Sequence, residues 1–595
     1  MKKNEPAPAG ADTLTRVLYV DLARRESHTE DRPDLFRGSL GGTGAAIGLL
    51  EEECPPGCDP LGPENPAIFT VGPLTSLFPL ASKTVAMFKS PLTGNLGESH
   101  CGGRSAIAIR LSGFGALVVR GRSDIPIYLA IHDGKVQFRN ATTIWGMNSH
   151  FTAGRAMRER EKGAGVRTIM RIGRAGENRV AYAGVTTETY RHFGRLGLGA
   201  VFGSKNLKGI VVSGRKTLKL PDPKRYREIY DALYESATRS PLMKKYHDLG
   251  TAENILPLNR LGGLPTRNLQ QATFAGAEEI SGENLAARHL GRRLACSHCP
   301  VACIHIAALR EPYEQENYFY KTVMIGYDYE PLYAAGSMLG IGDAPSVLRL
   351  IERMESLGLD IMSAGVVLSW ATEALEKGLI GSKETMDVPL AFGSLPGYLE
   401  ACEKIVRQPN EFYQALARGV EYASGKYGGR EFALAFGGNE MPGYHTGPAC
   451  HLGYLAGARH SHLDSAGYSI DQKDLIEKKL PPEEIARRLV REEQWRQVLS
   501  SLVVCFFARN IYTPETVRQC LAAAGIEQDE KGLNRIGAEI LRRKNLFKKA
   551  CGFSLETLRI PERIFTVPSP AGLIDEPLMR ETLRHIERMI LDPGD

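Results

Sequence analysis

The first third of the chain alternates short apolar runs with turns rich in glycine and proline. Residues 67–71 and 116–119 are mostly apolar runs of strand length with glycine or proline close by. Residues 127–131 and 136–138 flank Asp133-Gly134, a dipeptide that supplies the positive φ angles of a type I′ hairpin turn. We therefore expect a β-rich region whose many glycines let the backbone approach a ligand closely.

Beyond the first third, the apolar residues take the spacing of helices. Asp343 is placed to cap a helix that ends at Gly358, and Ser363 is placed to cap the next, which ends at Gly378. A further helix is expected to begin at the proline pair 481–482 and to run towards Cys505.

These patterns predict an α+β fold of three domains. A β-rich N-terminal domain is expected over residues 13–215, followed by two mostly α-helical domains over 216–425 and 426–595. Residues 1–12, rich in Pro, Ala and Gly, are expected to form a flexible tail. The second boundary falls in the glycine-rich stretch 425–429.

The composition narrows the class of protein. The 595 residues (65.2 kDa) are 43% hydrophobic and 24% charged, which is typical of a globular protein and excludes a disordered or collagen-like chain. A net charge of +6 without charge blocks does not indicate a nucleic-acid partner. No apolar stretch is long enough to span a membrane, and the first residues lack the apolar core of a secretory signal. A cytoplasmic protein is expected.

Three of the eleven cysteines lie within eight residues, as Cys296-x2-Cys299-x3-Cys303. Three thiolates on a tight turn can hold three corners of an iron–sulfur cubane, with a fourth ligand from elsewhere. Two other interpretations stay open on spacing alone: a zinc site completed by His298 or His305, or buried cysteines without a ligand.

Several motifs in order along the chain resemble the tungsten-dependent aldehyde:ferredoxin oxidoreductase family. The resemblance extends over roughly residues 14–550 and rests on the cysteine run together with GPLT (72–75), KSPLTG (89–94), GRAGEN (173–178), GLGAVFGSKNLK (197–208), YEPL (329–332) and LGLD (357–360).

The resemblance implies a β-rich base domain that carries two metal-binding pterins, which together chelate one tungsten or molybdenum. Each helical domain would close over one pterin. A [4Fe-4S] cluster would lie beside one of them, and its ligands by position would be Cys296, Cys299, Cys303 and Cys505. Electrons would leave to a ferredoxin or to an iron–sulfur partner subunit, and the resemblance leaves a homodimer possible.

The family's pterin-binding positions match unevenly. Gly102, Arg191, Arg195 and Asp360 keep their residue types, whereas Glu355 replaces Asp and Lys83 replaces Arg. His100 stands where the family has an Asn that helps to hold magnesium between the pterin phosphates. Magnesium prefers oxygen ligands, so either this ion is absent or backbone carbonyls hold it. The remaining departures are Ser500 for a carboxylate, Val503 for glycine, Asp464 for a lysine, and Arg349 and Glu352 for the ligands of an interfacial iron, which we therefore do not expect.

Two residues match the family's positions beside the metal: Glu330 and His462. A carboxylate and an imidazole suffice to move the protons of an aldehyde oxidation. The loop around His462 is shorter than usual in the family, so His460, His451 and His445 are alternatives. Cys450 and Cys101 are candidates for places near the cofactor, or are small buried residues.

Three functions are compatible with these features. The favoured one is oxidation of an aldehyde to a carboxylic acid, with a small-molecule aldehyde as substrate. The second is other low-potential chemistry on the same scaffold, such as reduction of an aromatic thioester. The third is an electron-transfer or scaffold subunit that keeps the cluster and has lost the metal pterin. The cluster and a reduced metal would be oxygen-sensitive, which predicts an anaerobic host.

Overall fold

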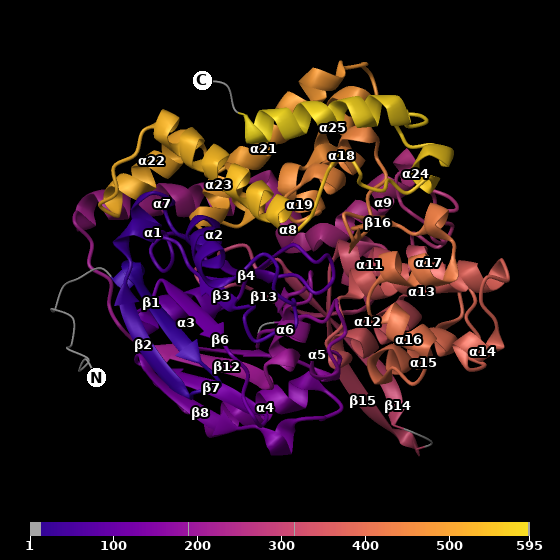
Figure 1. Ribbon diagram of the computed structural model, residues 1–595, viewed down its shortest axis with the longest axis horizontal. Coiled ribbons are helices and arrows are strands. Elements are labelled where there is room, and N and C mark those ends of the chain that lie inside the picture. Colours follow the sequence, from indigo (N-terminus) through magenta and orange to yellow (C-terminus); the bar gives the residue numbers. More distant parts are fainter. Residues whose placement is uncertain (1–12, 189, 314–315, 593–595) are drawn as a thin grey trace.

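Two six-stranded sheets make up the N-terminal third of this computed structural model, which describes residues 13–188, 190–313 and 316–592 (Figure 1). The first sheet has the order β2 (Glu26–Asp31), β1 (Arg16–Asp21), β6 (Ala116–Arg120), β3 (Ala67–Thr70), β4 (Thr84–Lys89), β5 (Leu96–Cys101). The second has the order β11 (His192–Phe193), β10 (Val185–Thr186), β9 (Val166–Arg171), β12 (Leu207–Gly214), β7 (Ile127–His132), β8 (Lys135–Asn140). The predicted tail, residues 1–12, lies outside the described residues.

Local turn chemistry sets the hairpin of the second sheet. Asp133 and Gly134 have φ angles of 47° and 86°, so the predicted type I′ turn between β7 and β8 is confirmed. Helix α2 (Gly42–Glu53) covers β3 and β4, and α3 (Ser105–Ser112) contacts β9 and β12.

The rest of the chain is mostly helical and covers the sheets from above and from the right in Figure 1. The N-terminal third also carries α1 (Pro33–Arg37), α4 (His150–Arg160), α5 (Arg174–Glu177) and α6 (Leu198–Ser204). The middle helices are α7 (Pro223–Arg239), α8 (Pro241–Asp248), α9 (Ile255–Leu261), α10 (Gly282–Arg288), α11 (Tyr329–Ala335), α12 (Ala344–Leu357), α13 (Ile361–Glu376), α14 (Ser382–Thr385), α15 (Leu395–Arg407), α16 (Glu411–Leu416) and α17 (Val420–Tyr427). The later helices are α18 (Pro448–Ala456), α19 (His462–Ser465), α20 (Gly467–Ile470), α21 (Pro482–Ser501), α22 (Pro514–Ala523), α23 (Glu530–Ala550), α24 (Arg563–Thr566) and α25 (Glu576–Leu591).

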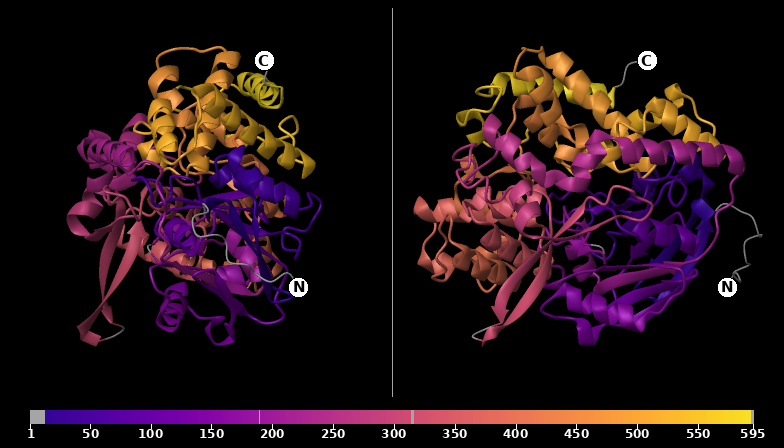
Figure 2. Two further views of the ribbon diagram at one scale, coloured as in Figure 1. Left: turned by 90° about the vertical axis from the view of Figure 1, so that its left-hand side faces the viewer. Right: turned by 180° about the vertical axis from the view of Figure 1, so that it is seen from behind.

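The predicted α+β fold class, a β-rich first part followed by mostly helical parts, is confirmed. The middle region also contains a sheet that the sequence patterns did not predict, formed by β13 (Leu290–Leu294), β14 (Ile304–Tyr313) and β15 (Glu316–Tyr327). Figure 2 shows β14 and β15 projecting from the body as a long hairpin. The domain boundaries near 215 and 425 stay predictions; α17 runs across the second and ends before Gly428. Among the described residues, no helix is both long and apolar enough to cross a membrane.

The caps of the two central helices are partly as expected. Asp343 caps α12 by accepting the Ser346 N–H, and Gly358, at φ 83°, ends it. The prediction that Ser363 caps the next helix is wrong, because Asp360 occupies that place and accepts the Ser363 N–H. Asp360, a predicted cofactor residue, therefore also caps the start of α13.

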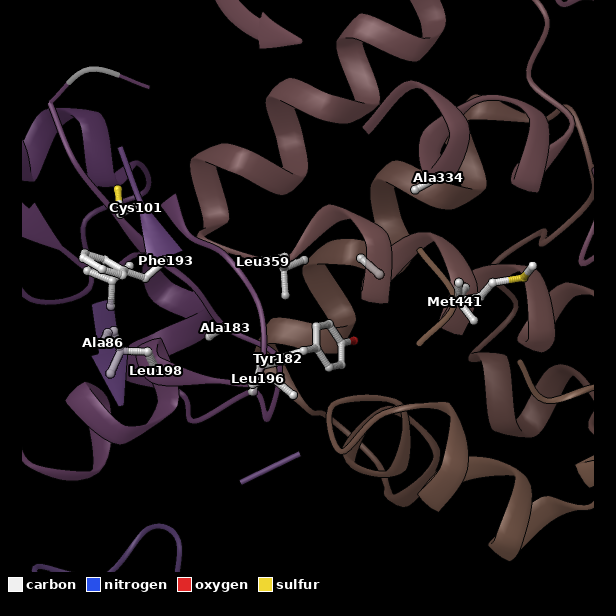
Figure 3. Packing of buried hydrophobic residues seen from close by; sticks show 14 of the residues in the cluster. Ala86, Cys101, Tyr182, Ala183, Phe193, Leu196, Leu198, Ala334, Leu359 and Met441 are labelled. Carbon is white, nitrogen blue, oxygen red and sulfur yellow. The ribbon is translucent and has the colours of Figure 1, made fainter. Parts of the chain in front are cut away.

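Backbone pairing joins the first third of the chain to these helices. The Asp360 N–H donates to Tyr182 O at 3.0 Å, and the Gly184 N–H donates to Gly358 O at 3.0 Å. Side chains from both parts pack along this junction, where Tyr182 and Leu359 lie between the sheets and the helices (Figure 3). The positions of residues 355–360 are therefore fixed by the β-rich part.

A buried ion pair joins the first sheet to the last third of the chain. Glu98 on β5 accepts from Lys544 on α23 at 2.5 Å and from Thr43 at 2.8 Å. The side chains of Glu98 and Lys544 are each only 1% exposed. Removing one partner of such a pair strands the other charge in a medium that solvates it poorly.

We predict that Lys544→Met lowers the free energy of unfolding by about 3 kcal/mol. The readout is the midpoint of thermal unfolding, compared with Lys531→Met, an exposed lysine on the same helix. The double variant Glu98→Gln, Lys544→Met should recover part of the loss. An unchanged midpoint in Lys544→Met would show that the pair does not hold the two parts together.

Candidate functional site

The four predicted cluster cysteines surround one small cavity. Cys296, Cys299 and Cys303 lie on the loop between β13 and β14, and Cys505 follows the end of α21. All four line a cavity of about 90 Å³. Two loops that are remote in the sequence thus bring their thiols to a single place.

A segment of the N-terminal third connects the two cysteine loops. The Leu80 N–H donates to His298 O at 3.0 Å, and the Cys505 N–H donates to Leu80 O at 2.9 Å. The Lys83 N–H donates to Val503 O at 3.1 Å. Gly102 lies behind Cys296, since a Cβ at this position would be 2.8 Å from Cys296 Sγ. A side chain at position 102 would therefore collide with this sulfur, which explains the glycine.

Two cations lie beside the thiols. Arg191 Nη2 is 3.9 Å from Cys303 Sγ and Arg191 Nη1 is 3.5 Å from Asp328 Oδ2. Burial acts to lower the pKa of Lys83, but the charges of Cys505 and Cys296 outweigh it and the pKa is raised. Both residues therefore stay cationic and can balance thiolate charge.

Burial and mutual repulsion oppose ionisation of the thiols themselves. Burial, followed by the neighbouring cysteines, raises the pKa of Cys299 to about 12. Burial raises the pKa of Cys303 to about 11, although Arg191 acts against it. Such thiols ionise when a positively charged metal group replaces their protons.

The geometry argues against the zinc interpretation. His305 directs Nδ1 to Cys303 O at 3.2 Å and Nε2 to His247 O at 3.0 Å, and the His298 side chain is exposed. Within the described residues, no three His, Cys, Asp or Glu side chains converge as the ligands of a single metal ion do. Four thiols spread around a cavity favour a multi-atom cluster.

A larger cavity of about 360 Å³ adjoins the thiol cavity. Six residues line both cavities, so that only side chains separate them: Lys83, Arg191, Thr251, Asp328, Cys505 and Phe507. The volume lies at the lower end of the range of roughly 300–1,000 Å³ that is usual for small-molecule sites.

Glu330 and His462 form a pair on the wall of the larger cavity. His462 Nε2 is 3.0 Å from Glu330 Oε1, and the Tyr444 hydroxyl donates to the same oxygen at 3.1 Å. Burial acts to raise the pKa of Glu330, but His462 and Tyr444 outweigh it and the pKa is lowered. The carboxylate is therefore ionised at neutral pH.

The other candidate histidines have different partners. His445 Nδ1 lies 2.9 Å from His451 Nε2, and His460 Nδ1 lies 2.9 Å from Tyr454 O. Of the four imidazoles considered, the structure places His462 against Glu330.

The predicted pterin residues Arg195 and Asp360 face each other across the junction of α13 with the β-rich part. Arg195 Nε donates to Asp360 Oδ2 at 3.2 Å, and Ser363 Oγ lies 2.6 Å from the same oxygen. Ser363 Oγ is also 2.7 Å from Glu440 Oε2. One hydroxyl hydrogen cannot serve two carboxylates, so one of the two acids carries a proton. Burial raises the pKa of Glu440 to about 7, which places the proton there.

Glu355, the other acid at the end of α12, lies 2.9 Å from His192 Nε2, and both residues line the larger cavity. His100 Nε2 is 2.6 Å from Glu98 Oε1, and burial lowers the pKa of His100 to about 4. A neutral imidazole paired with a carboxylate does not supply the oxygen ligands that magnesium prefers. The residues present here do not fit a magnesium ion at His100.

The remaining departures have structural explanations. Val503 has a φ of 55°, a left-handed conformation that costs a residue with a Cβ about 1–2 kcal/mol and that explains the family's glycine. Asp464 accepts from Arg459 Nε at 2.7 Å and from the Ser461 N–H at 3.0 Å, so it shapes the loop before His462. Ser500 is the exception: its carbonyl oxygen lies close to Gly42, and nothing in the structure explains its side chain.

Four other residues that the sequence analysis considered do not line the larger cavity. Cys101 and Cys450 are fully buried, and burial raises the pKa of each to about 12, which favours their interpretation as small core residues. Arg349 and Glu352 line a separate groove between α12 and α15 and pair with each other at 3.6 Å.

Several unsatisfied polar atoms indicate that the larger cavity accepts a polar ligand. Arg191 Nε, Arg195 Nη1, Asn439 Oδ1 and His462 Nδ1 are buried without a hydrogen-bond partner among the described residues, and all four residues line this cavity. Buried polar atoms of this kind normally have a hydrogen-bond partner, and a guanidinium suits phosphate oxygens. These four atoms suit a ligand that is negatively charged and carries polar groups on a ring.

Sequence patterns missed other residues of this cavity. Asp328, His192, Asn439, Tyr444, Arg459 and Arg496 line it and were not singled out. Four of them lie beside residues that were singled out: Asp328 precedes the YEPL motif that carries Glu330, His192 follows Arg191, Tyr444 precedes His445, and Arg459 precedes His460.

The fold matches that of a solved protein structure. The chain matches the solved structure titled "Active site complex BamBC of Benzoyl Coenzyme A reductase in complex with 1,5 Dienoyl-CoA" with a TM-score of 0.83, covering 97% of this chain and 94% of that one. At 20% identity this likeness concerns the fold alone.

The chain belongs to the aldehyde ferredoxin oxidoreductase family. Residues 17–214 match that family's N-terminal domain, and residues 228–591 match its domains 2 and 3. Relatives named tungsten-containing aldehyde ferredoxin oxidoreductase, from Pyrococcus abyssi and Pyrococcus furiosus, are each 32% identical over 94% of this chain and 92% of their own. A P. furiosus protein named "Aliphatic sulfonate oxidoreductase, WOR-like subunit" is 29% identical over 66% of this chain and 64% of its own. Family membership supports an oxidoreductase.

We predict that Gly102→Ala disturbs the thiol cavity, because its Cβ would displace the sulfur of Cys296. The expected result is at least a several-fold loss of iron per chain in anaerobically purified protein. Gly38→Ala is the control, since a Cβ at Gly38 meets no atom within 4 Å. Equal iron in both variants would contradict the steric argument.

We predict that Glu440→Gln flattens the pH dependence of stability between about pH 4.5 and pH 7. The pKa of Glu440 is raised in the fold, so its stabilising contribution is complete below the unfolded pKa and is lost as the pH rises through the folded value. Thermal midpoints across this range, with exposed Glu431→Gln as control, measure the effect. A parallel pH profile in Glu440→Gln and the unmodified chain would mean that Glu440 is ionised.

Proposed function

We propose that the chain oxidises an aldehyde to a carboxylic acid. The reaction consumes one water and one aldehyde and releases one acid, two protons and two electrons. The observation that carries the proposal is the common wall between the two cavities, where six residues line both the thiol cavity and the cavity of the Glu330–His462 pair. Electrons released in one cavity then have a short path to the other.

The proposed cofactors are a tungsten or molybdenum bis-pterin in the larger cavity and a [4Fe-4S] cluster in the thiol cavity. Tungsten appears in the names of the two Pyrococcus relatives that are 32% identical to this chain. The N–H groups of Arg191 and Arg195 that lack a partner suit an anionic pterin. The residues proposed to hold the pterins are Lys83, His100, Gly102, Arg191, Arg195, Glu355 and Asp360. When bound, the metal would polarise the carbonyl and accept the two electrons. We leave magnesium out of the set because His100 pairs with Glu98.

Glu330 orients His462 for proton transfer. In the tautomer that carries its hydrogen on Nε2, His462 donates to the ionised Glu330, and the lone pair of Nδ1 is left as the proton acceptor. His462 Nδ1 is buried and has no partner among the described residues, so it can take a proton from water or substrate in the cavity. Tyr444 donates to the same carboxylate oxygen and helps to fix its position.

Cys296, Cys299, Cys303 and Cys505 are proposed as the cluster ligands. Lys83 and Arg191 beside them offset the negative charge of four thiolates and favour the reduced cluster. One cluster passes electrons singly, so the acceptor is proposed to be a ferredoxin or an iron–sulfur partner subunit.

A second candidate function is low-potential reduction of an aromatic thioester. The structural likeness to the benzoyl-CoA reductase complex supports the scaffold for it, although at 20% identity it does not extend to the substrate. The acid–base pair against a cavity favours aldehyde oxidation, and a chain that only transfers electrons would have no use for that pair.

We predict that Glu330→Gln lowers kcat/KM for aldehydes by about 10²–10⁴-fold, because the amide no longer fixes the imidazole tautomer. The assay is an aldehyde panel with a viologen dye as electron acceptor under anaerobic conditions, and iron and tungsten contents should stay at the level of the unmodified chain. Glu283→Gln, an exposed carboxylate, serves as control. Full activity in Glu330→Gln would exclude the proposed role, and turnover of aromatic thioesters but not of aldehydes would support the second candidate.

A further inference from the structure

A second group of thiols lies away from both cavities, where α2 ends. Cys54 closes α2, and its N–H donates to Leu50 O. Residues 55–57, Pro-Pro-Gly, turn the chain back, and the Cys58 N–H donates to Pro55 O at 3.0 Å. The turn brings the two sulfurs to 3.6 Å. A disulfide bond is about 2.05 Å long, so a small side-chain rotation would close it.

The two thiols differ in access. Cys54 is 1% exposed, whereas Cys58 is half-buried and can meet a small reagent. Lys89 Nζ donates to Cys58 O at 2.8 Å, so an ammonium group lies beside the pair. Burial raises the pKa of Cys54, with the charge of Cys58 adding to the rise. The exposed member is therefore the one that an oxidant reaches first.

A third thiol, Cys551, follows the end of α23 and is also half-buried. The charge of Cys551 acts to raise the pKa of Cys54, and the charge of Cys58 acts to raise the pKa of Cys551. The described residues do not bring three such side chains together as ligands of a single ion, so a metal site does not account for this group.

We propose that Cys54 and Cys58 form a reversible disulfide by exchange with a low-molecular-weight disulfide such as oxidised glutathione. The Cys58 thiolate attacks one sulfur of the reagent, forms a mixed disulfide and releases one thiolate. The Cys54 thiolate then attacks the Cys58 sulfur, forms the Cys54–Cys58 bond and releases the second thiolate. The two cysteines lose two electrons and the reagent gains them.

The bond closes a loop of five residues, so it constrains the unfolded chain little and adds little stability. Its formation is governed by the redox potential of the surroundings. An enzyme whose cluster thiols must stay reduced thus carries a separate dithiol that reports oxidising conditions at its surface.

The test uses the full chain in its cofactor-loaded form, equilibrated anaerobically with a series of reduced-to-oxidised glutathione ratios. Free thiols are alkylated after acid quenching and unfolding, and the protein is digested with trypsin. Cys54 and Cys58 share one tryptic peptide, residues 38–83, which contains no internal Lys or Arg. A disulfide between them removes both alkyl groups from that peptide.

We expect at least a tenfold fall in doubly alkylated 38–83 peptide at oxidising ratios, reversed by dithiothreitol, while the buried Cys402 and Cys520 stay alkylated. In Cys58→Ser, Cys54 should stay alkylated at every ratio; Cys520→Ser is the matched control. The proposal is overturned if the peptide stays doubly alkylated, if it carries a lasting glutathione adduct, or if Cys58 links to Cys551 instead. Because the unmodified chain gives the decisive result, poor folding of a variant does not obscure it.

Discussion

The convergence of two remote cysteine loops on one small cavity is the constraint on which the site depends. Neither loop is held by its own secondary structure, since both follow the ends of regular elements. Backbone hydrogen bonds from Leu80 and Lys83 fix both loops to the N-terminal third of the chain, and Gly102 leaves room for Cys296. The left-handed backbone of Val503, unfavourable for a β-branched residue, is held by the same contacts.

The electrostatics follow from this arrangement. Four half-buried thiolates require positive charge nearby, and Lys83 and Arg191 provide it from the wall that the two cavities share. Two nearby carboxylates respond in opposite directions: hydrogen bonds from His462 and Tyr444 outweigh burial and lower the pKa of Glu330, whereas burial raises the pKa of Glu440 to about 7. The difference suits their places, because Glu330 lines the larger cavity and orients His462, whereas Glu440 shares the Ser363 hydroxyl with Asp360.

Local signals in the sequence predicted local structure well. Asp133-Gly134 specified a hairpin turn, and Asp343 and Gly358 specified the two ends of α12. The prediction of Ser363 as the cap was wrong because Asp360, three positions earlier, is an equally suitable capping residue. Only the backbone pairing of residues 182–184 with 358–360 decides between the two. The β14–β15 hairpin escaped prediction because its outer part is exposed and lacks an apolar alternation.

The candidate site was predictable to the extent that its residues lie in motifs. The cysteine run is dense enough to stand out, whereas Cys505 follows an apolar run and emerged only through the family resemblance. Tyr444 and Arg459 lie directly beside candidate histidines, but their roles and that of Glu440 depend on tertiary contacts that no spacing encodes.

The central claim is that the two adjoining cavities hold a cluster and a metal pterin. Metal and acid-labile sulfide analysis of anaerobically purified protein, run beside Cys505→Ala, tests it most directly. The account predicts about four irons and about one tungsten or molybdenum per chain, consistent with a cubane cluster, with iron lost in the variant. Iron and sulfide without the heavier metal would contradict the enzyme function in favour of an electron-transfer subunit, and zinc alone would contradict the cluster.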